Sequence, residues 1–306
     1  MKTKAKTENS SIITIGTFDG VHIGHQKILE YLVKSSKKIN LTPTVLTLFP
    51  HPRMVLQKDN SIKLLNTIDE RIELLKSFGI EEVIVKPFTK AFSNLSAEDY
   101  VKSILVEELN TKQVVIGYDH HFGKNRSANI EDLRTFAKTY HFKVEEISAQ
   151  DIEDVTVSST KIRTALDKGE VDLANSYLGY NYFITGEVVK GKGLGRTIDY
   201  PTANISIKED YKLIPHDGVY VVKSTIDNTT IFGMMNIGTN PTVGGKTRSI
   251  EVHFFGLEKD IYNEDLKIEF LKRLRNEQKF ENLEALKDQL SKDKTDALAF
   301  IKNQNE

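Results

Sequence analysis

A glycine-rich turn between an apolar run and an amphipathic segment is the feature that most constrains this chain. Ile12-Ile13-Thr14-Ile15 is followed by Gly16-Thr17-Phe18-Asp19-Gly20-Val21-His22-Ile23-Gly24-His25, which predicts a strand, a turn and a helix. The first amides of a helix lack backbone partners and favour anions. Glycines allow close approach to a ligand, and His22 and His25 would add donors on one face of the first helical turn. The segment predicts a phosphate site, and nucleotidyl transfer explains it better than binding alone.

The first half of the chain alternates short β-branched runs with amphipathic stretches. This alternation predicts an α/β Rossmann-like domain, with a parallel sheet and helices on both faces. Such sheets bind ligands beyond the carboxyl ends of their strands, where the glycine-histidine turn falls. Capping-box patterns begin two of the stretches, Thr67 with Glu70 and Ser96 with Asp99. The expected strands are residues 12–16, 44–49, 82–86, 113–117 and 143–147.

The second half changes character after residue 180. Strand-like runs are separated by Gly, Asn, Asp and Pro turns without helical spacers, which predicts a mainly antiparallel β-barrel or sheet. Leucines at near-helical spacing predict a terminal helix over residues 281–303. We therefore expect one domain over residues 1–180 and a second over residues 181–306. The expected strands of the second are residues 183–190, 218–225, 230–237, 249–255 and 266–270.

Composition narrows the class of protein. The 306 residues suffice for two ordinary domains, and 42 Lys and Arg against 43 Asp and Glu leave no basic excess for nucleic acid. The absence of cysteine excludes disulfides, thiolate zinc sites and a cysteine nucleophile. The chain has neither a membrane-spanning apolar run nor the apolar core of a signal peptide at its start. We expect a cytoplasmic protein that acts on small molecules, without nucleic-acid, membrane or obligatory protein partners.

Three further clusters in the first half follow expected strand ends or open a helix. Phe49-Pro50-His51-Pro52 ends the second strand, and its prolines restrict the backbone around His51. The sequence from Gly117 to Arg126, GYDHHFGKNR, follows the fourth strand, and SSTKIR at residues 158–163 has the form of a capped helix start with two cations. Nucleotidyl transfer needs positioning and charge neutralisation more than covalent chemistry. Histidines, a helix N-terminus, Arg and Lys would supply both, together with Mg²⁺.

Polar clusters also mark the second half. The glycine-rich, basic loop over residues 186–196 suits the wrapping of a polyphosphate, although it lacks the ending of a Walker A loop. Thr202 and Asn204 would present a hydroxyl and an amide oxygen on one strand face, and hard neutral oxygens are ligands that suit Mg²⁺. Further on, Glu251 and His253 share one face of a predicted strand, opposite its apolar residues.

These motifs, in this order, resemble the prokaryotic bifunctional riboflavin kinase/FMN adenylyltransferase family, also called FAD synthetase, over residues 11–300. GTFDGVHIGH, FPHP, GYDHHFGKNR and SSTKIR resemble its adenylyltransferase half. GKGLGR, PTAN, the Glu251 strand and residues 273–280 resemble its kinase half. The resemblance implies that riboflavin is phosphorylated by ATP to FMN, and that FMN is adenylylated by ATP to FAD with release of pyrophosphate.

The resemblance also implies roles for individual residues. Glu251 would accept the proton of the ribityl hydroxyl, and His22 and His25 would stabilise the ATP phosphates during adenylyl transfer. Thr202 and Asn204 would hold Mg²⁺. Nucleotide contacts are expected at Gly16, Phe18, Asp19, Gly24, Ser159, Thr160, Arg163, Gly191, Gly193, Gly195 and Arg196. Flavin contacts are expected at His51, Asp119, Arg126 and Arg275.

The chain departs from the family pattern at three places: His120-His121, Phe255-Gly256-Leu257, and Asn263, where glycine is common. The last two motivate an alternative in which the second domain binds flavin or nucleotide for regulation without catalysis. A nucleotidyltransferase with another phosphate acceptor is a further alternative, against which the kinase-like half argues. Taken singly, each motif also fits a structural role, such as a capping histidine or a solvated strand glutamate.

Overall fold

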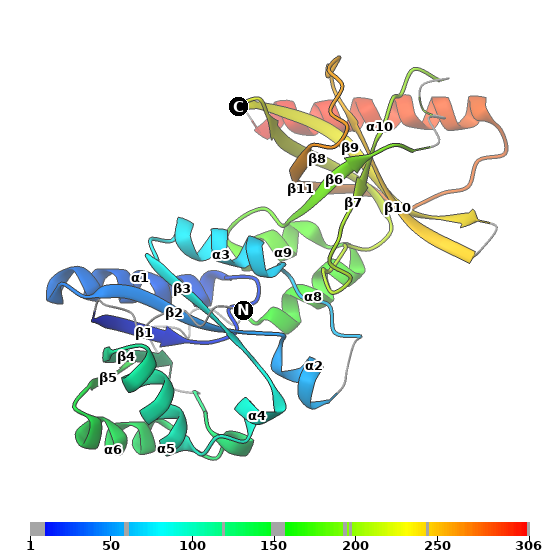
Figure 1. The fold of residues 1–306 in the computed structure, drawn as a ribbon. Helices are drawn as coiled ribbons and strands as arrows, with labels where there is room; N and C mark the ends of the chain where they lie inside the picture. Colours follow the sequence, from blue (N-terminus) through cyan, green and yellow to red (C-terminus); the bar gives the residue numbers. More distant parts are fainter. Residues whose placement is uncertain are drawn as a thin grey trace. The chain divides into compact units, whose positions relative to one another are not determined.

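A computed structural model describes residues 10–57, 61–117, 120–147, 157–191, 195, 198–242 and 245–304, leaving out the side chains of 240–242 and 245–247. Contacts between residues divide the chain into two compact units, Met1–Ser159 and Thr160–Glu306. Figure 1 shows the fold of each unit. The expected domain boundary at residue 180 stays a prediction.

The first unit is built on a five-stranded parallel sheet in the order β3-β2-β1-β4-β5. Each expected strand is present, with its ends shifted by at most two residues, because β-branched runs between turns identify buried parallel strands well. The strands are β1 (Ser11–Ile15), β2 (Thr42–Phe49), β3 (Glu82–Pro87), β4 (Thr111–Gly117) and β5 (Lys143–Ile147).

Helices cover both faces of this sheet, as the alternation predicted; Figure 1 shows α1 and α3 on the opposite side from α5 and α6. The capping box of Thr67 and Glu70 is present in full, whereas at Ser96 only the hydroxyl accepts from the Asp99 amide. The helices are α1 (Ile23–Ile39), α2 (Pro52–Leu56), α3 (Ile68–Ser77), α4 (Lys90–Ser93), α5 (Ala97–Asp99), the π-helix η1 (Tyr100–Glu108), the 3-10 turn η2 (Lys124–Arg126) and α6 (Ile130–Tyr140).

The strand order reverses direction beside β1, and this places the candidate site. From β1 the chain crosses over to β2 and β3, whereas β4 lies on the other side of β1 and leads to β5. Parallel sheets bind ligands in the crevice at such a reversal, outside the carboxyl ends of the strands. The glycine-histidine turn follows β1 at that edge, and β4 ends there at Gly117.

The second unit is a closed barrel in the order β10-β7-β6-β11-β8-β9, with antiparallel neighbours throughout. The barrel prediction is confirmed, and the short β7 is the one strand without an expected range, although Asn204 was expected on a strand face; Thr202 lies just before β7. The terminal helix α10 (Leu283–Gln304) lies along the barrel, as Figure 1 shows in red. The strands are β6 (Phe183–Val189), β7 (Ala203–Ser206), β8 (Gly218–Ile226), β9 (Thr229–Thr242), β10 (Gly245–Phe254) and β11 (Asp265–Arg275).

Helices α8 (Ser159–Lys168) and α9 (Val171–Leu178) precede the barrel and pack against it. The Asn175 amide donates to the Phe270 carbonyl at 2.9 Å, and the His216 amide donates to the Leu166 carbonyl at 2.9 Å. These contacts explain why the chain divides before α8 and not after α9. Within the described ranges, no helix is long and apolar enough to cross a membrane.

Candidate functional site

The turn after β1 is held in backbone conformations that most residues avoid. Phe18, Gly20 and Val21 have φ of 46°, 90° and 36°. A Cβ on Gly16 would lie 3.0 Å from the Phe18 ring, so a larger residue at this position would crowd that ring. Phe18 itself is buried, with its ring centroid 5.0 Å from that of His25. The buried Phe18 ring therefore supports the histidine pair from inside the protein.

His22 caps α1 from outside, which corrects the expectation that both histidines lie within the first helical turn. Its Nδ1 accepts a hydrogen bond from the His25 amide at 3.4 Å. The local sequence explains this, because the positive φ of Val21 turns the chain just before the helix begins. The two rings stack with centroids 3.6 Å apart and planes inclined by 16°. The pair is a single rigid feature at the helix N-terminus.

The surroundings keep both imidazoles neutral near pH 7. Burial lowers the pKa of His22 to about 4, against the opposing effect of the Asp19 carboxylate. Burial, then His22, then Arg71 hold the pKa of His25 well below 6.5. Because Nδ1 of His22 is the acceptor, neutral His22 carries its proton on Nε2 and is a donor there. Such a pair donates hydrogen bonds to an anion without adding full charge.

The Asp19 carboxylate is buried in the interior of the protein, and its expected nucleotide contact stays a prediction. The carboxylate is 1% exposed, accepts from the Leu65 amide at 3.0 Å and the Asn66 amide at 3.3 Å, and lies 3.6 Å from Arg71 Nη2. The Ser159 hydroxyl donates to the Asp19 backbone carbonyl at 2.8 Å. The structure thus brings Ser159 to the turn and gives Asp19 the place of an internal anchor.

The other expected residues of the first half are spread over several elements. His51 caps α2, where its Nδ1 accepts from the Arg53 amide at 3.2 Å. Arg126 is exposed in η2 with φ of 57°, and Gly24 is buried in the first turn of α1. Thr160 is exposed and Arg163 half-buried on α8, within the second unit. Asp119 lies outside the described residues.

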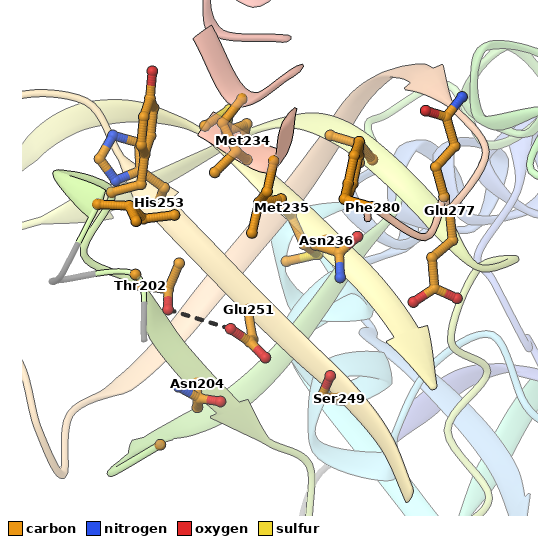
Figure 2. Close-up of a pocket in the computed structure, with 18 of the residues that line it drawn as sticks. Thr202, Asn204, Met234, Met235, Asn236, Ser249, Glu251, His253, Glu277 and Phe280 are labelled. Atoms are coloured by element: carbon orange, nitrogen blue, oxygen red, sulfur yellow. Dashed lines mark hydrogen bonds between the residues drawn. The ribbon is translucent and has the colours of Figure 1, made fainter. Parts of the chain in front are cut away.

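A cavity of about 520 Å³ opens in the barrel unit, and Figure 2 shows residues that line it. Ser249, Glu251 and His253 all line it, which confirms their common strand face. Glu251 stands opposite Asn204 of β7 on one side and Asn236 of β9 on the other. Directly opposite side chains share one face of a sheet, so the carboxylate stands between two amides.

Hydrogen bonds organise the polar end of this cavity. The Thr202 hydroxyl donates to Glu251 Oε2 at 3.3 Å, the dashed line in Figure 2. His253 donates from Nδ1 to the Pro201 carbonyl at 2.8 Å. Because burial lowers the pKa of His253, the ring is neutral near pH 7 while it holds Pro201, the residue before Thr202. A Cβ on Gly191 would lie 2.0 Å from the Asn204 amide nitrogen, so only glycine lets this loop come so close. Gly193 and Arg196 fall outside the described residues, and Gly195 accepts from the Tyr200 amide at 2.8 Å.

The far wall of the cavity is apolar and comes from β9, the segment after β11, and α10. It includes Met234, Met235, Phe280, Leu286 and Leu290. A polar and anionic end joined to an apolar wall suits a ligand with a flat apolar ring and a hydroxylated or phosphorylated end.

Arg275 lines the same cavity, but its guanidinium is held by a partner that sequence reasoning missed. Its Nε donates to Asp293 Oδ1 at 2.9 Å and its Nη2 donates to Oδ2 at 2.7 Å. Asp293 lies on α10, so the pair ties the last strand to the terminal helix. The expected flavin contact of Arg275 stays a prediction. The Arg275 side chain would make that contact while it is bound to Asp293.

Comparison with known proteins matches each half of the chain to a family. Residues 4–161 match the family model described as FAD synthetase, and residues 178–301 match the one described as riboflavin kinase. The bifunctional riboflavin kinase/FMN adenylyltransferase of Buchnera aphidicola subsp. Schizaphis graminum is 41% identical over 94% of this chain and 93% of its own length. Those of Bacillus subtilis and Escherichia coli K12 are 36% and 33% identical, each over 96% of this chain and 93% and 94% of their own lengths.

The chain belongs to the bifunctional riboflavin kinase/FMN adenylyltransferase family. It is thus an enzyme of flavin biosynthesis with a kinase and a nucleotidyltransferase activity. A solved structure titled a macrolide-efflux protein, from Streptococcus pneumoniae, has the same architecture, with a TM-score of 0.86 and 32% identity over 95% of both chains. The expected family, activities and fold class are confirmed.

One departure from the family pattern has a direct physical explanation. Asn263 stands where glycine is common, and its φ is 64°. Among residues with a Cβ, asparagine tolerates this left-handed region best. The substitution therefore preserves the backbone path, in which the Asn263 amide donates to the Val188 carbonyl at 2.9 Å.

Asn236, Glu277 and Asp293 are three polar residues at or beside the cavity to which sequence reasoning gave no role. Asn236 had a signal, because it opens the family-like segment Asn236-Ile237-Gly238-Thr239-Asn240-Pro241-Thr242. Glu277 reaches back toward that segment, since a Cβ on Gly238 would lie 1.9 Å from its Oε1. Asp293 had no local signal, because its partner lies on another element.

Proposed function

We propose that Glu251 is the general base of FMN formation in the barrel cavity, and that His22 and His25 bind the ATP phosphates during FAD formation. The placement of Glu251 carries the proposal: it accepts from Thr202 at 3.3 Å and stands between Asn204 and Asn236 in a cavity of about 520 Å³. We assign the kinase step to residues 181–306 and the adenylyl transfer to residues 1–180.

In the kinase step, the terminal ribityl oxygen of riboflavin attacks the γ-phosphorus of ATP. The bond from that phosphorus to the bridging oxygen breaks, ADP leaves, and the hydroxyl proton passes to Glu251. A carboxylate suits this role because it is ionised at neutral pH and can accept from a positioned hydroxyl. Met234, Met235 and Phe280 would contact the flavin ring on the apolar wall.

Thr202 and Asn204 fit the Mg²⁺ that the kinase step requires. Mg²⁺ is usually held by one or two protein oxygens together with substrate phosphates and water. The described residues contain no group of three or more His, Cys, Asp or Glu that could form a metal site. Neutral oxygens beside the Gly191 backbone match that mode of binding, and the bound ion would neutralise phosphate charge.

A smaller cavity of about 90 Å³ shares Thr202 with the main one. Its lining includes Val188, Phe254, Ile261 and Tyr262, which offer apolar and aromatic surface. We assign the ATP base to this side, so that the triphosphate runs past Thr202 toward Glu251. Leu257, one of the departures from the family pattern, lines this cavity and would adjust affinity for the base.

In the adenylyl transfer, a phosphate oxygen of FMN attacks the α-phosphorus of ATP, and pyrophosphate leaves. Nε2 of His22 and the N-terminus of α1 would donate to the phosphates, and the loop after β4, with Asp119 and Arg126, would hold the flavin side. The position of the turn at the strand-order reversal supports this assignment. Because both steps consume ATP, we propose that the enzyme works in the cytoplasm.

The two assignments are tested by following flavins chromatographically from riboflavin with MgATP, and in parallel from FMN. Glu251→Gln should abolish FMN formation and leave FAD formation from added FMN intact. His25→Ala should do the reverse. Glu187→Gln, the same change at a half-buried position of β6, should leave both intact. A wild-type chain that makes FAD only from added FMN would overturn the kinase assignment in favour of a regulatory barrel.

A further inference from the structure

Arg71 of α3 is fully buried beside the adenylyl-transfer turn. Its side chain is 0% exposed, and its Nη2 lies 3.6 Å from Asp19 Oδ1, on a side chain that is 1% exposed. Burying a cation is costly unless its charge is compensated. The buried pair of Arg71 and Asp19 therefore costs stability, because both charges must leave water.

Hydrogen bonds and an ion pair hold the turn at three points, and Arg71 is linked to two of them. Arg71 Nη1 donates to Thr47 Oγ1 at 3.4 Å, and Thr47 in turn donates to the Thr17 carbonyl at 3.1 Å. The Gly20 amide donates to Asn66 Oδ1 at 2.9 Å. The carbonyl of Thr17, the carboxylate of Asp19 and the amide of Gly20 are thus each bound by β2 or by the segment that leads into α3.

The turn needs such support because its backbone is strained. Phe18 and Val21, which both carry a Cβ, have positive φ. Conformations of this kind persist only where the surroundings determine them, and they concentrate at functional sites. The histidine rings follow directly on this turn, so a shift of the turn moves the rings.

The charges around the histidine pair come from the same network. Asp19 favours protonation of His22, while His22 and Arg71 oppose protonation of His25. Removing the guanidinium would leave the buried Asp19 carboxylate uncompensated beside the two rings. Protonation of the pair would then become easier.

We propose that Arg71 is a positioning residue for adenylyl transfer: it fixes the Asp19 turn from inside the protein and thereby sets where the His22 and His25 rings stand. The inference rests on the proposed role of those histidines. Arg71 acts through the turn, since it has no exposed surface with which to touch a substrate.

The test compares Arg71→Met and Arg71→Lys for FAD formation from FMN across pH 4 to 8, a range that reaches the wild-type pKa of His22 at about 4. Arg71→Met should lower kcat by about 100-fold, the scale of a small misplacement of reacting groups. It should also move the acid limb of kcat to higher pH, because the histidines then protonate more easily. Arg71→Lys keeps the charge and loses the planar fork that reaches both Asp19 and Thr47, so kcat should fall about tenfold with the acid limb unmoved.

FMN formation by the same chains reports whether the barrel unit is intact, and Lys86→Met serves as the matched control. Lys86 pairs with Glu108 in the same sheet unit, so the control removes an ion-pair cation away from the turn, and FAD formation should persist.

If Arg71→Met does not fold, Arg71→Lys decides the question, and a wild-type kcat in Arg71→Lys overturns the inference. An unmoved acid limb in a folded Arg71→Met, or a change in KM alone, overturns it too. FAD formation that survives His25→Ala would instead remove the proposed function itself.

Discussion

Removing the Asp293 carboxylate should destabilise the barrel unit by about 3 kcal/mol. Arg275 and Asp293 are only 16% and 3% exposed, and their shortest contact is 2.7 Å. The Gln289 amide also donates to Asp293 Oδ1 at 2.8 Å. Breaking a buried pair from one side costs about 3–5 kcal/mol, because the remaining charge is left without a partner. The residual exposure of Arg275 places Asp293→Ala at the low end of that range.

For a unit of this size, 1 kcal/mol moves the midpoint by about 2–4 °C, so Asp293→Ala should lower Tm by about 6–12 °C. The measurement is thermal unfolding by calorimetry, in which the barrel transition is identified by its stabilisation with added FMN. The matched control is Asp199→Asn, which removes the charge of a second carboxylate partner of α10, the exposed one paired with Lys287, and keeps a residue that tolerates the φ of 66° at this position. Exposed pairs contribute little, so that variant should show no resolvable shift.

The reasoning fails if Asp293→Ala unfolds within 2 °C of the wild type, a shift of less than about 1 kcal/mol. It also fails if Asp199→Asn loses as much, because the loss would then follow from removing any ion pair of α10. Asp293→Asn should fall between the two, since it keeps the shape and one acceptor oxygen but removes the charge.

Three further predictions concern single positions. Burial lowers the pKa of His22 from its ordinary 6.5 to about 4 in the folded protein, so the unfolded chain binds its proton first as pH falls. The first unit should therefore lose about 3 kcal/mol of stability between pH 6.5 and 4, and urea titrations of His22→Asn, which keeps a capping side chain, should show a flatter profile. Gly191→Ala places a methyl 2.0 Å from the Asn204 amide and should reduce FMN formation about tenfold or more, with FAD formation from FMN unchanged in the same chromatographic assay. Asn263→Ala should cost about 1 kcal/mol in thermal unfolding and Asn263→Gly nothing, because φ is 64° there; equal stability of the two would contradict the backbone argument.

Much of the fold was predictable because its signals are local. β-branched runs between turn residues marked all five strands of the parallel sheet, and five of the six barrel strands. The exception, β7, has only four residues, Ala203–Ser206, too few for a clear alternation. The capping box at Thr67 was readable because both of its partners lie within four residues of sequence.

The candidate sites were predictable in their members and less so in their orientations. His22, His25, Thr202, Asn204 and Glu251 are named by short motifs, and the structure places the histidines together at one turn and the other three together in one cavity. The inward direction of the Asp19 side chain was not readable, because it depends on amides of Leu65 and Asn66 that fold back from another part of the chain.

The sequence by itself therefore determined the family, the two activities, and the alternation of elements, since each is encoded in neighbouring residues. Tertiary structure alone decided the strand order around β1, the closure of the barrel and the partners of buried charges. The register of β10 between β7 and β9 sets Glu251 between Asn204 and Asn236, and the packing of α10 sets Asp293 against Arg275. Pairings of this kind join residues far apart in the chain. The strand register is selected by burial of the strand faces, and the ion pair by burial of its two charges.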